Sequence, residues 1–118
     1  MAKVLLVEDD QTMVTLLNTL LEMEGLEVST LESFDNIVSD ILVQNPDVII
    51  MDVNLEDIDG LQLLEVIRKE NSLSHVKVIM SSGMNFLEES LSRGADGFLL
   101  KPYMPDELIA RINKLLDS

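Results

Sequence analysis

The stretch Asp-Val-Ile-Ile-Met-Asp at residues 47–52 decides the fold class of this sequence. Four large apolar residues follow one another, without the alternation of apolar and polar residues that marks a strand with one solvent-exposed face. Such a run is typical of a central parallel strand that helices cover on both faces. It ends at Asp52, and a carboxylate at the end of a buried strand needs water or a positive partner. Asp52 is therefore a candidate functional residue.

Four further strands are predicted on either side of this one. Apolar runs mark them at residues 3–7, 26–30, 76–80 and 97–100. The segment 26–30 is more polar than the others, which favours an edge position. Strands that alternate with helical patterns indicate an α/β fold, with a mainly parallel sheet and helices on both faces.

The intervening segments carry apolar residues at helical spacing. The first helical face holds Met13, Leu16, Leu17, Leu20 and Leu21, and the second holds Ile37, Val38, Ile41 and Leu42. We expect Gly25 to end the first helix and Ser33 to act as N-cap of the second. Asp59 is the expected N-cap of a third helix, and Pro105 opens the last one. Residues 85–92 predict a weak fourth helix that buries Phe86, Leu87 and Leu91.

Composition limits the functions open to this chain. It has 118 residues, 47 % of them hydrophobic, no cysteine and a net charge of −14. We expect one domain over residues 1–118 and a cytoplasmic location, because no apolar run approaches the ~18 residues of a membrane span. The negative charge argues against direct binding to nucleic acid or anionic membranes.

Charged and polar residues follow the predicted strands. They are Glu8 and Asp9, Asp52, the pair Ser81–Ser82, and Lys101. Parallel strands bring their carboxyl ends to one edge of a sheet, where ligands bind in such folds. Carboxylates ~4 Å apart repel by ~1 kcal/mol in water and more in a protein. Lys101 and a hard divalent cation would offset this repulsion, and oxygen ligands with bound water suit Mg²⁺, with Mn²⁺ as the alternative.

A divalent cation beside a carboxylate indicates phosphoryl chemistry. Asp52 is placed to attack phosphorus, since carboxylates form aspartyl-phosphates. Lys101 would hold one phosphoryl oxygen and a serine hydroxyl another. We favour Ser82 over Ser81 for that hydroxyl because Ser82 directly precedes Gly83.

Four segments resemble the receiver domain of two-component response regulators. They are VLLVEDD (4–10), PDVIIMDVNLEDIDG (46–60), VIMSSG (78–83) and GADGFLLKPY (94–103), in the order of that family and along the whole chain. The resemblance implies five parallel strands in the order 2-1-3-4-5 with five helices. It also implies that Asp52 is the phosphoacceptor, that Glu8 and Asp9 hold the metal, and that the Asn54 carbonyl completes its coordination.

The resemblance further implies that Ser82 and Phe98 form a switch, and that Lys101 precedes a cis proline. Three positions depart from the usual family pattern. Glu56 stands where proline is common, Ser82 replaces threonine, and Phe98 lacks a tyrosine hydroxyl. Apolar Met84, two residues after Ser82, is hypothesised to slow loss of the phosphoryl group.

The predicted function is that of a phosphorelay signalling domain. A sensor histidine kinase or phosphotransfer protein would phosphorylate Asp52, and the surface of the fourth helix, fifth strand and fifth helix would then control a downstream protein. We expect a monomer or a phosphorylation-dependent dimer. Because the sequence stops after the fifth helix without an output domain, we expect either a stand-alone receiver or a domain excised from a longer regulator. The alternatives are an unphosphorylated interaction module and an aspartate-nucleophile phosphatase; a flavin-binding module is disfavoured by Glu8 and Asp9. The phosphatase is disfavoured because Asn54 stands where such enzymes commonly carry a second aspartate.

Overall fold

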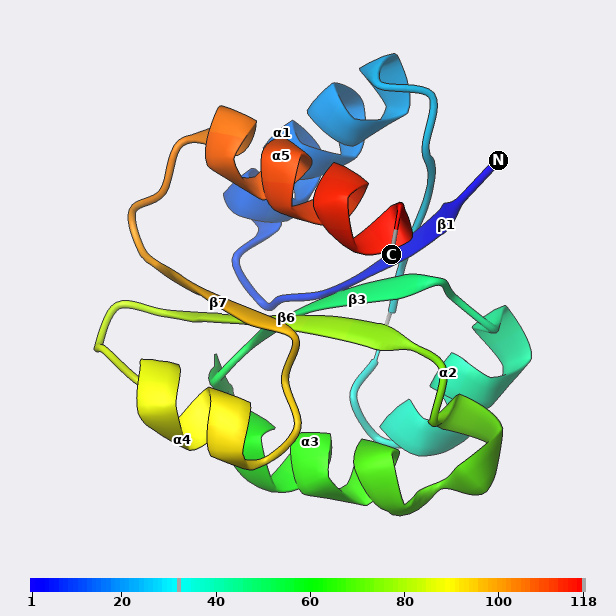
Figure 1. Cartoon of the computed structure of the whole chain (residues 1–118), viewed down its shortest axis with the longest axis vertical. Helices are drawn as coiled ribbons and strands as arrows, with labels where there is room; N and C mark the ends of the chain where they lie inside the picture. Colours follow the sequence, from blue (N-terminus) through cyan, green and yellow to red (C-terminus); the bar gives the residue numbers. More distant parts are fainter. Residues whose placement is uncertain (32, 118) are drawn as a thin grey trace.

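Five parallel strands form the centre of the molecule (Figure 1). The computed structural model describes residues 1–31 and 33–117. Its large sheet contains β1 (Lys3–Val7), β2 (Glu27–Thr30), β3 (Val48–Asp52), β6 (Lys77–Ser82) and β7 (Gly97–Leu100). They lie in the order β2-β1-β3-β6-β7, which confirms the expected order 2-1-3-4-5 and the edge position of β2.

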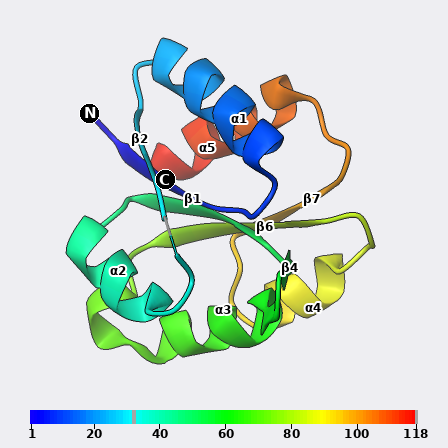
Figure 2. The ribbon, with the colours of Figure 1, turned by 180° about the vertical axis from the view of Figure 1, so that it is seen from behind.

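Helices cover both faces of this sheet (Figures 1 and 2). One face carries α1 (Gln11–Met23) and α5 (Pro105–Leu116), and the other carries α2 (Ile37–Gln44), α3 (Gly60–Lys69) and α4 (Leu87–Ser92). All five residues of β3 are buried, with Ile49 and Met51 in one hydrophobic cluster and Val48 and Ile50 in the other. The apolar run at 47–52 is thus the shared centre of two cores, as a doubly covered strand requires.

Capping hydrogen bonds begin two of the helices, and the one at Asp59 confirms the cap that the sequence predicts. Asp59 Oδ1 accepts from the backbone N–H groups of Leu61 and Gln62 at the start of α3. Asp10 caps α1 in the same way. Pro105 is the first residue of α5, where its missing N–H costs no helical hydrogen bond.

Other local predictions are wrong. Helix α2 begins at Ile37, and its N-cap is Asn36 rather than Ser33, whose hydroxyl closes a turn by accepting from the Asp35 N–H. Helix α4 is only six residues long, and it turns Ser90 toward the core while Leu87 and Leu91 stay 43 % and 48 % exposed. Leu16 of α1 is also exposed, outside the buried stripe of that helix.

Three short elements had no prediction. A two-stranded antiparallel hairpin pairs β4 (Asn54–Leu55) with β5 (Ile58–Asp59), directly after β3. A single turn of 3₁₀ helix, η1 (Asn71–Leu73), joins α3 to β6. No helix in the described parts of the chain is long and apolar enough to cross a bilayer.

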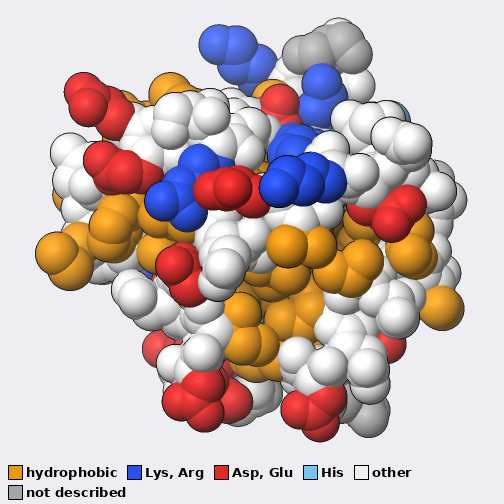
Figure 3. All heavy atoms as spheres, turned by 90° about the horizontal axis from the view of Figure 1, so that it is seen from below, with side chains coloured by type: hydrophobic (Ala, Val, Ile, Leu, Met, Phe, Trp, Pro, Cys, Tyr) orange, Lys and Arg blue, Asp and Glu red, His pale blue; other side chains and the backbone are white. Residues whose placement is uncertain are grey.

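Basic side chains gather on the side of α3 and α4. Figure 3 views this side and shows Lys and Arg in a band with acidic side chains among them. Two ion pairs occur here, Arg68 with Asp96 at 2.9 Å and Arg93 with Glu65 at 3.1 Å. The two arginines on this side are therefore paired with acidic neighbours of their own, apart from the carboxylates that follow β1 and β3.

Candidate functional site

The polar residues predicted to meet do follow the strands as expected. Glu8 and Asp9 come after β1, Asp52 is the last residue of β3, Ser82 is the last of β6, and Lys101 comes directly after β7. Strand β3 lies between β1 and β6, and β7 lies beyond β6. Parallel pairing therefore brings these five side chains to one edge of the sheet.

Lys101, which follows the edge strand β7, contacts the carboxylates that follow β1 and β3. Its Nζ donates to Glu8 Oε1 at 2.5 Å and to Asp52 Oδ2 at 2.9 Å. These partners are 93 and 49 residues away in the sequence, so only the topology brings them together. The Lys101–Pro102 peptide bond is cis, as the resemblance implied.

Asp52 is held by the backbone around it. The side chain is buried, and its Oδ1 accepts from the Asn54 N–H at 3.1 Å. Gly60 lies directly behind it, because its N–H donates to the Val53 carbonyl at 2.7 Å. A Cβ at Gly60 would sit 2.3 Å from the Asp52 carbonyl oxygen, so only glycine lets α3 start this close to the end of β3.

Three carboxylates converge at this position. Glu8, Asp9 and Asp52 each offer one oxygen, and these oxygens all lie within 4.8 Å of one another. Glu8 Oε2 accepts from the N–H groups of Asp9 and Asp10, which fixes the second oxygen of Glu8 away from Lys101. Asp9 is anchored differently, since its Oδ2 accepts from the Glu56 N–H at 3.0 Å.

Burial and neighbouring charges shift the pKa values of Glu8 and Lys101. Burial, with the nearby charge of Asp52, raises the pKa of Glu8 even though the Lys101 hydrogen bond opposes the shift. Burial opposes the charge of Lys101, but its bonds to Glu8 and Asp52 outweigh this and raise the pKa of the ammonium. Burial, together with the Asp52 charge, thus disfavours ionised Glu8, and a bound cation would offset this effect.

Ser82 and Phe98, the two predicted switch residues, are both buried. The Ser82 hydroxyl is buried and accepts from the Met84 N–H at 3.1 Å and, at 3.5 Å, from the Asn54 side-chain amide. It thus faces the loop that follows Asp52. Phe98 is buried in the cluster below α3 and α4, while the side chain of Met84 is 66 % exposed.

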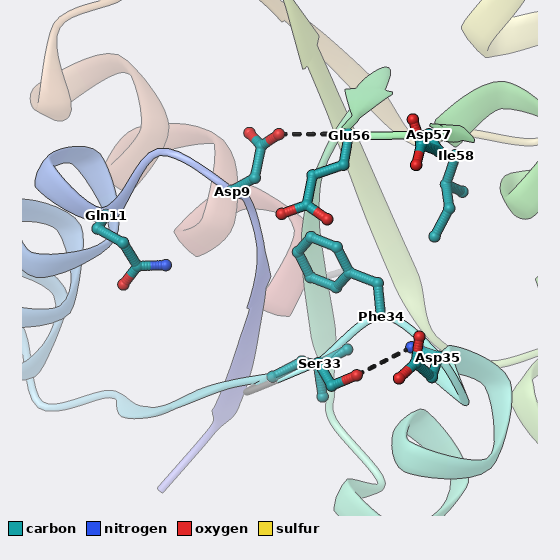
Figure 4. Close-up of a pocket in the computed structure, with 9 residues that line it drawn as sticks. Asp9, Gln11, Ser33, Phe34, Asp35, Glu56, Asp57 and Ile58 are labelled. Atoms are coloured by element: carbon teal, nitrogen blue, oxygen red, sulfur yellow. Dashed lines mark hydrogen bonds between the residues drawn. The ribbon is translucent and has the colours of Figure 1, made fainter.

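A cavity of about 370 Å³ opens beside Asp9. Figure 4 shows Glu56, Phe34 and Asp35 around it, from the loops that follow β3 and β2. Neither Glu56 nor Asp35 was predicted to lie near the site. Short-range sequence patterns do not reveal them, because Glu56 contacts Asp9 across 47 residues and Asp35 only lines the same cavity.

The donor set fits a hard divalent cation. Within residues 1–31 and 33–117, the carboxylates of Glu8, Asp9 and Asp52 form the one cluster of metal-ligating side chains. All three are oxygen ligands, and Lys101 occupies one oxygen of Glu8 and one of Asp52. Oxygen ligands with room for water suit Mg²⁺ or Mn²⁺ better than Zn²⁺.

Known proteins share this sequence pattern and fold. The family model described as "Response regulator receiver domain" matches residues 4–113. The alkaline phosphatase synthesis transcriptional regulatory protein PhoP of Bacillus subtilis is 30 % identical over 97 % of this chain and 48 % of its own length. The cell cycle response regulator CtrA of Brucella ovis is 34 % identical over 97 % and 50 %. The chain spans about half the length of these curated relatives.

A solved structure agrees with these relatives. The receiver domain of the Francisella response regulator 1452 is 32 % identical, with a TM-score of 0.89 over 99 % of this chain and 98 % of that one. Receiver domains of this kind are signalling regulators rather than classical enzymes. The sequence segments, the strand order and these matches together place the chain in the response regulator receiver domain family.

Proposed function

We propose that residues 1–118 form one receiver domain that is switched by Mg²⁺-dependent phosphorylation of Asp52. One observation carries the proposal: the buried Asp52 carboxylate lies 2.9 Å from Lys101 Nζ and beside the carboxylates of Glu8 and Asp9. This is the arrangement that phosphoryl transfer to a carboxylate requires, with a nucleophile and positive charge on the transferred group. Mn²⁺ is the alternative ion.

The phosphodonor is a phosphohistidine of a sensor histidine kinase or phosphotransfer protein. An oxygen of Asp52 attacks phosphorus, a P–O bond forms and the P–N bond breaks. The electron pair stays on the imidazole nitrogen, which then takes a proton from solvent. Lys101 and the Ser82 hydroxyl bind phosphoryl oxygens in the product.

The metal ligands are Glu8, Asp9, Asp52 and the backbone carbonyl of Asn54. When bound there, Mg²⁺ supplies positive charge that neutralises the transferred phosphoryl group. Lys101 keeps Glu8 and Asp52 together before transfer, because it donates to both carboxylates.

The output surface is the face of α4, β7 and α5. Leu87, Leu91, Leu100 and Met104 are 43–64 % exposed on these elements and the loop that joins them. Helix α4 has no side-chain N-cap and buries only Ser90, whose hydroxyl has no hydrogen-bond partner within the described residues. Such a helix is easily displaced. Movement of Ser82 toward the phosphoryl group makes room for Phe98 and shifts α4.

The partners are proteins. The domain receives its phosphoryl group from the kinase or phosphotransfer protein and controls an unidentified downstream protein in the cytoplasm, as a monomer or a phosphorylation-dependent dimer. With a net charge of −14, the domain itself binds neither nucleic acid nor membrane directly.

The test is phosphorylation by a small molecule. The protein is incubated with Mg²⁺ and an acyl phosphate, and intact mass spectrometry follows the adduct. We expect one labile phosphoryl group that needs Mg²⁺ and is absent from Asp52→Asn. Failure to form an adduct would favour the unphosphorylated interaction module, and continuous release of free phosphate would favour the phosphatase.

A further inference from the structure

The connection between β4 and β5 has an unusual backbone. Asn54 pairs with Asp59 and Leu55 with Ile58, so only Glu56 and Asp57 join the two short strands. Glu56 has φ of 47°, in the left-handed region that residues other than glycine seldom adopt. Strained backbone of this kind persists where surrounding contacts hold it, and it is concentrated at functional sites.

This conformation aims the Glu56 N–H at the loop after β1. The amide donates to Asp9 Oδ2 at 3.0 Å, across 47 residues of sequence (Figure 4). The bond engages Oδ2 of Asp9, and Asp9 offers one carboxylate oxygen to the cluster that it forms with Glu8 and Asp52. Lys101 donates hydrogen bonds to the carboxylates of Glu8 and Asp52. Among the described residues, the hydrogen bond to the Asp9 carboxylate comes instead from the backbone amide of Glu56.

We propose that the backbone amide of Glu56 is a positioning group for Asp9 as a divalent-cation ligand. Carboxylates that bind metals are themselves oriented by hydrogen bonds, and loss of such a partner weakens metal binding about 10–100-fold. The inference rests on the proposed Mg²⁺ site. It assigns a role to the shape of the hairpin rather than to the Glu56 carboxylate, which is exposed.

Two uncharged variants separate the amide from the carboxylate. Glu56→Gly removes the charge but keeps an N–H and tolerates positive φ. Glu56→Pro installs the residue that is common at this position in the family; it removes the same charge, lacks an N–H and cannot adopt φ near 47°. Calorimetric titration with Mg²⁺ is expected to give a dissociation constant about 10-fold higher for the proline variant than for the glycine variant. Equal affinities of the two variants would overturn the proposal.

Amide exchange provides a second measurement on a chain that keeps Glu56. The Glu56 amide is expected to exchange with solvent several-fold faster in Asp9→Ala than in the wild type, while amides of β6 are unchanged. Unchanged exchange at Glu56 would also overturn the proposal, and this comparison tests the positioning role even if the proline variant does not fold.

If the wild type itself takes up no Mg²⁺, the proposed metal-dependent function fails. If wild type and glycine variant bind Mg²⁺ and the proline variant matches them, only the positioning role fails.

Discussion

An ionic cluster lies at each end of the sheet, and the two clusters differ in charge balance. At the amino ends of β6 and β7, Arg68 donates to the carbonyls of Gly94 and Val76 and to the Asp96 carboxylate, at 2.7–2.9 Å. We call this the Arg68 cluster. The Lys101 cluster, at the carboxyl ends, sets one ammonium against the carboxylates of Glu8, Asp9 and Asp52.

The difference separates a structural network from a functional one. In the Arg68 cluster the guanidinium pairs with Asp96, which also accepts from the Val78 N–H, so both charged groups have partners within the protein. In the Lys101 cluster two negative charges remain when all three acids are ionised. A balanced cluster stabilises the fold, whereas an unbalanced one costs stability, which is expected of the proposed cation and phosphoryl site.

The largest effect is expected from breaking the balanced cluster. Arg68→Met removes three hydrogen bonds, which leaves the carbonyls of Gly94 and Val76 without this donor and Asp96 without its arginine partner. We expect the free energy of unfolding in urea to fall by about 2–3 kcal/mol. Mg²⁺ affinity should not change, since the cluster lies at the opposite end of the sheet.

The matched control is Arg93→Met. Arg93 pairs with Glu65, and both side chains are more than a third exposed. Exposed ion pairs contribute at most ~1 kcal/mol, so this variant should lose much less stability. If the two arginine variants lost equal stability, the Arg68 cluster would have no special structural role.

The sequence predicted one of these clusters and missed the other. Topology alone brings Glu8, Asp52 and Lys101 together, because each follows a parallel strand. Arg68 lies on a helix, and Asp96 is 28 residues away in a loop before β7, so no strand-end rule connects them. A single arginine near the end of a helix is usually a solvated residue.

The same limit explains the local errors. Asp59 and Pro105 were predicted correctly because a cap depends on neighbouring residues. Leu87 and Leu91 have a helical apolar spacing, but the short α4 is oriented by its connections to β6 and β7 and presents Ser90 to the core. The left-handed Glu56 is likewise held by its tertiary contact with Asp9, which its own sequence neighbours do not specify.

A smaller effect is expected from reducing the imbalance of the Lys101 cluster. Asp52→Asn keeps the shape of the side chain and removes one of three crowded charges, at the cost of the bond to Lys101. Without divalent cations, we expect the variant to be more stable than the wild type by about 1 kcal/mol in urea denaturation. Millimolar Mg²⁺ should stabilise the wild type but not the variant, because only a protein that binds the ion gains from it. A variant less stable than the wild type without metal would show that the imbalance carries no cost.

The smallest effect is expected from pH, and it isolates Glu8. Burial raises the pKa of Glu8 above 4.5 in the folded protein, so the unfolded chain releases this proton first as pH rises. The contribution of Glu8 to stability is therefore greatest below pH 4.5 and is lost as pH rises through its folded pKa. Glu8→Gln cannot ionise at this position. Between about pH 4 and about pH 7, the wild type should lose stability relative to Glu8→Gln in urea denaturation at each pH without metal. A constant difference across this range would mean that Lys101 already offsets the charge of Glu8, and that the Lys101 cluster is as balanced as the Arg68 cluster.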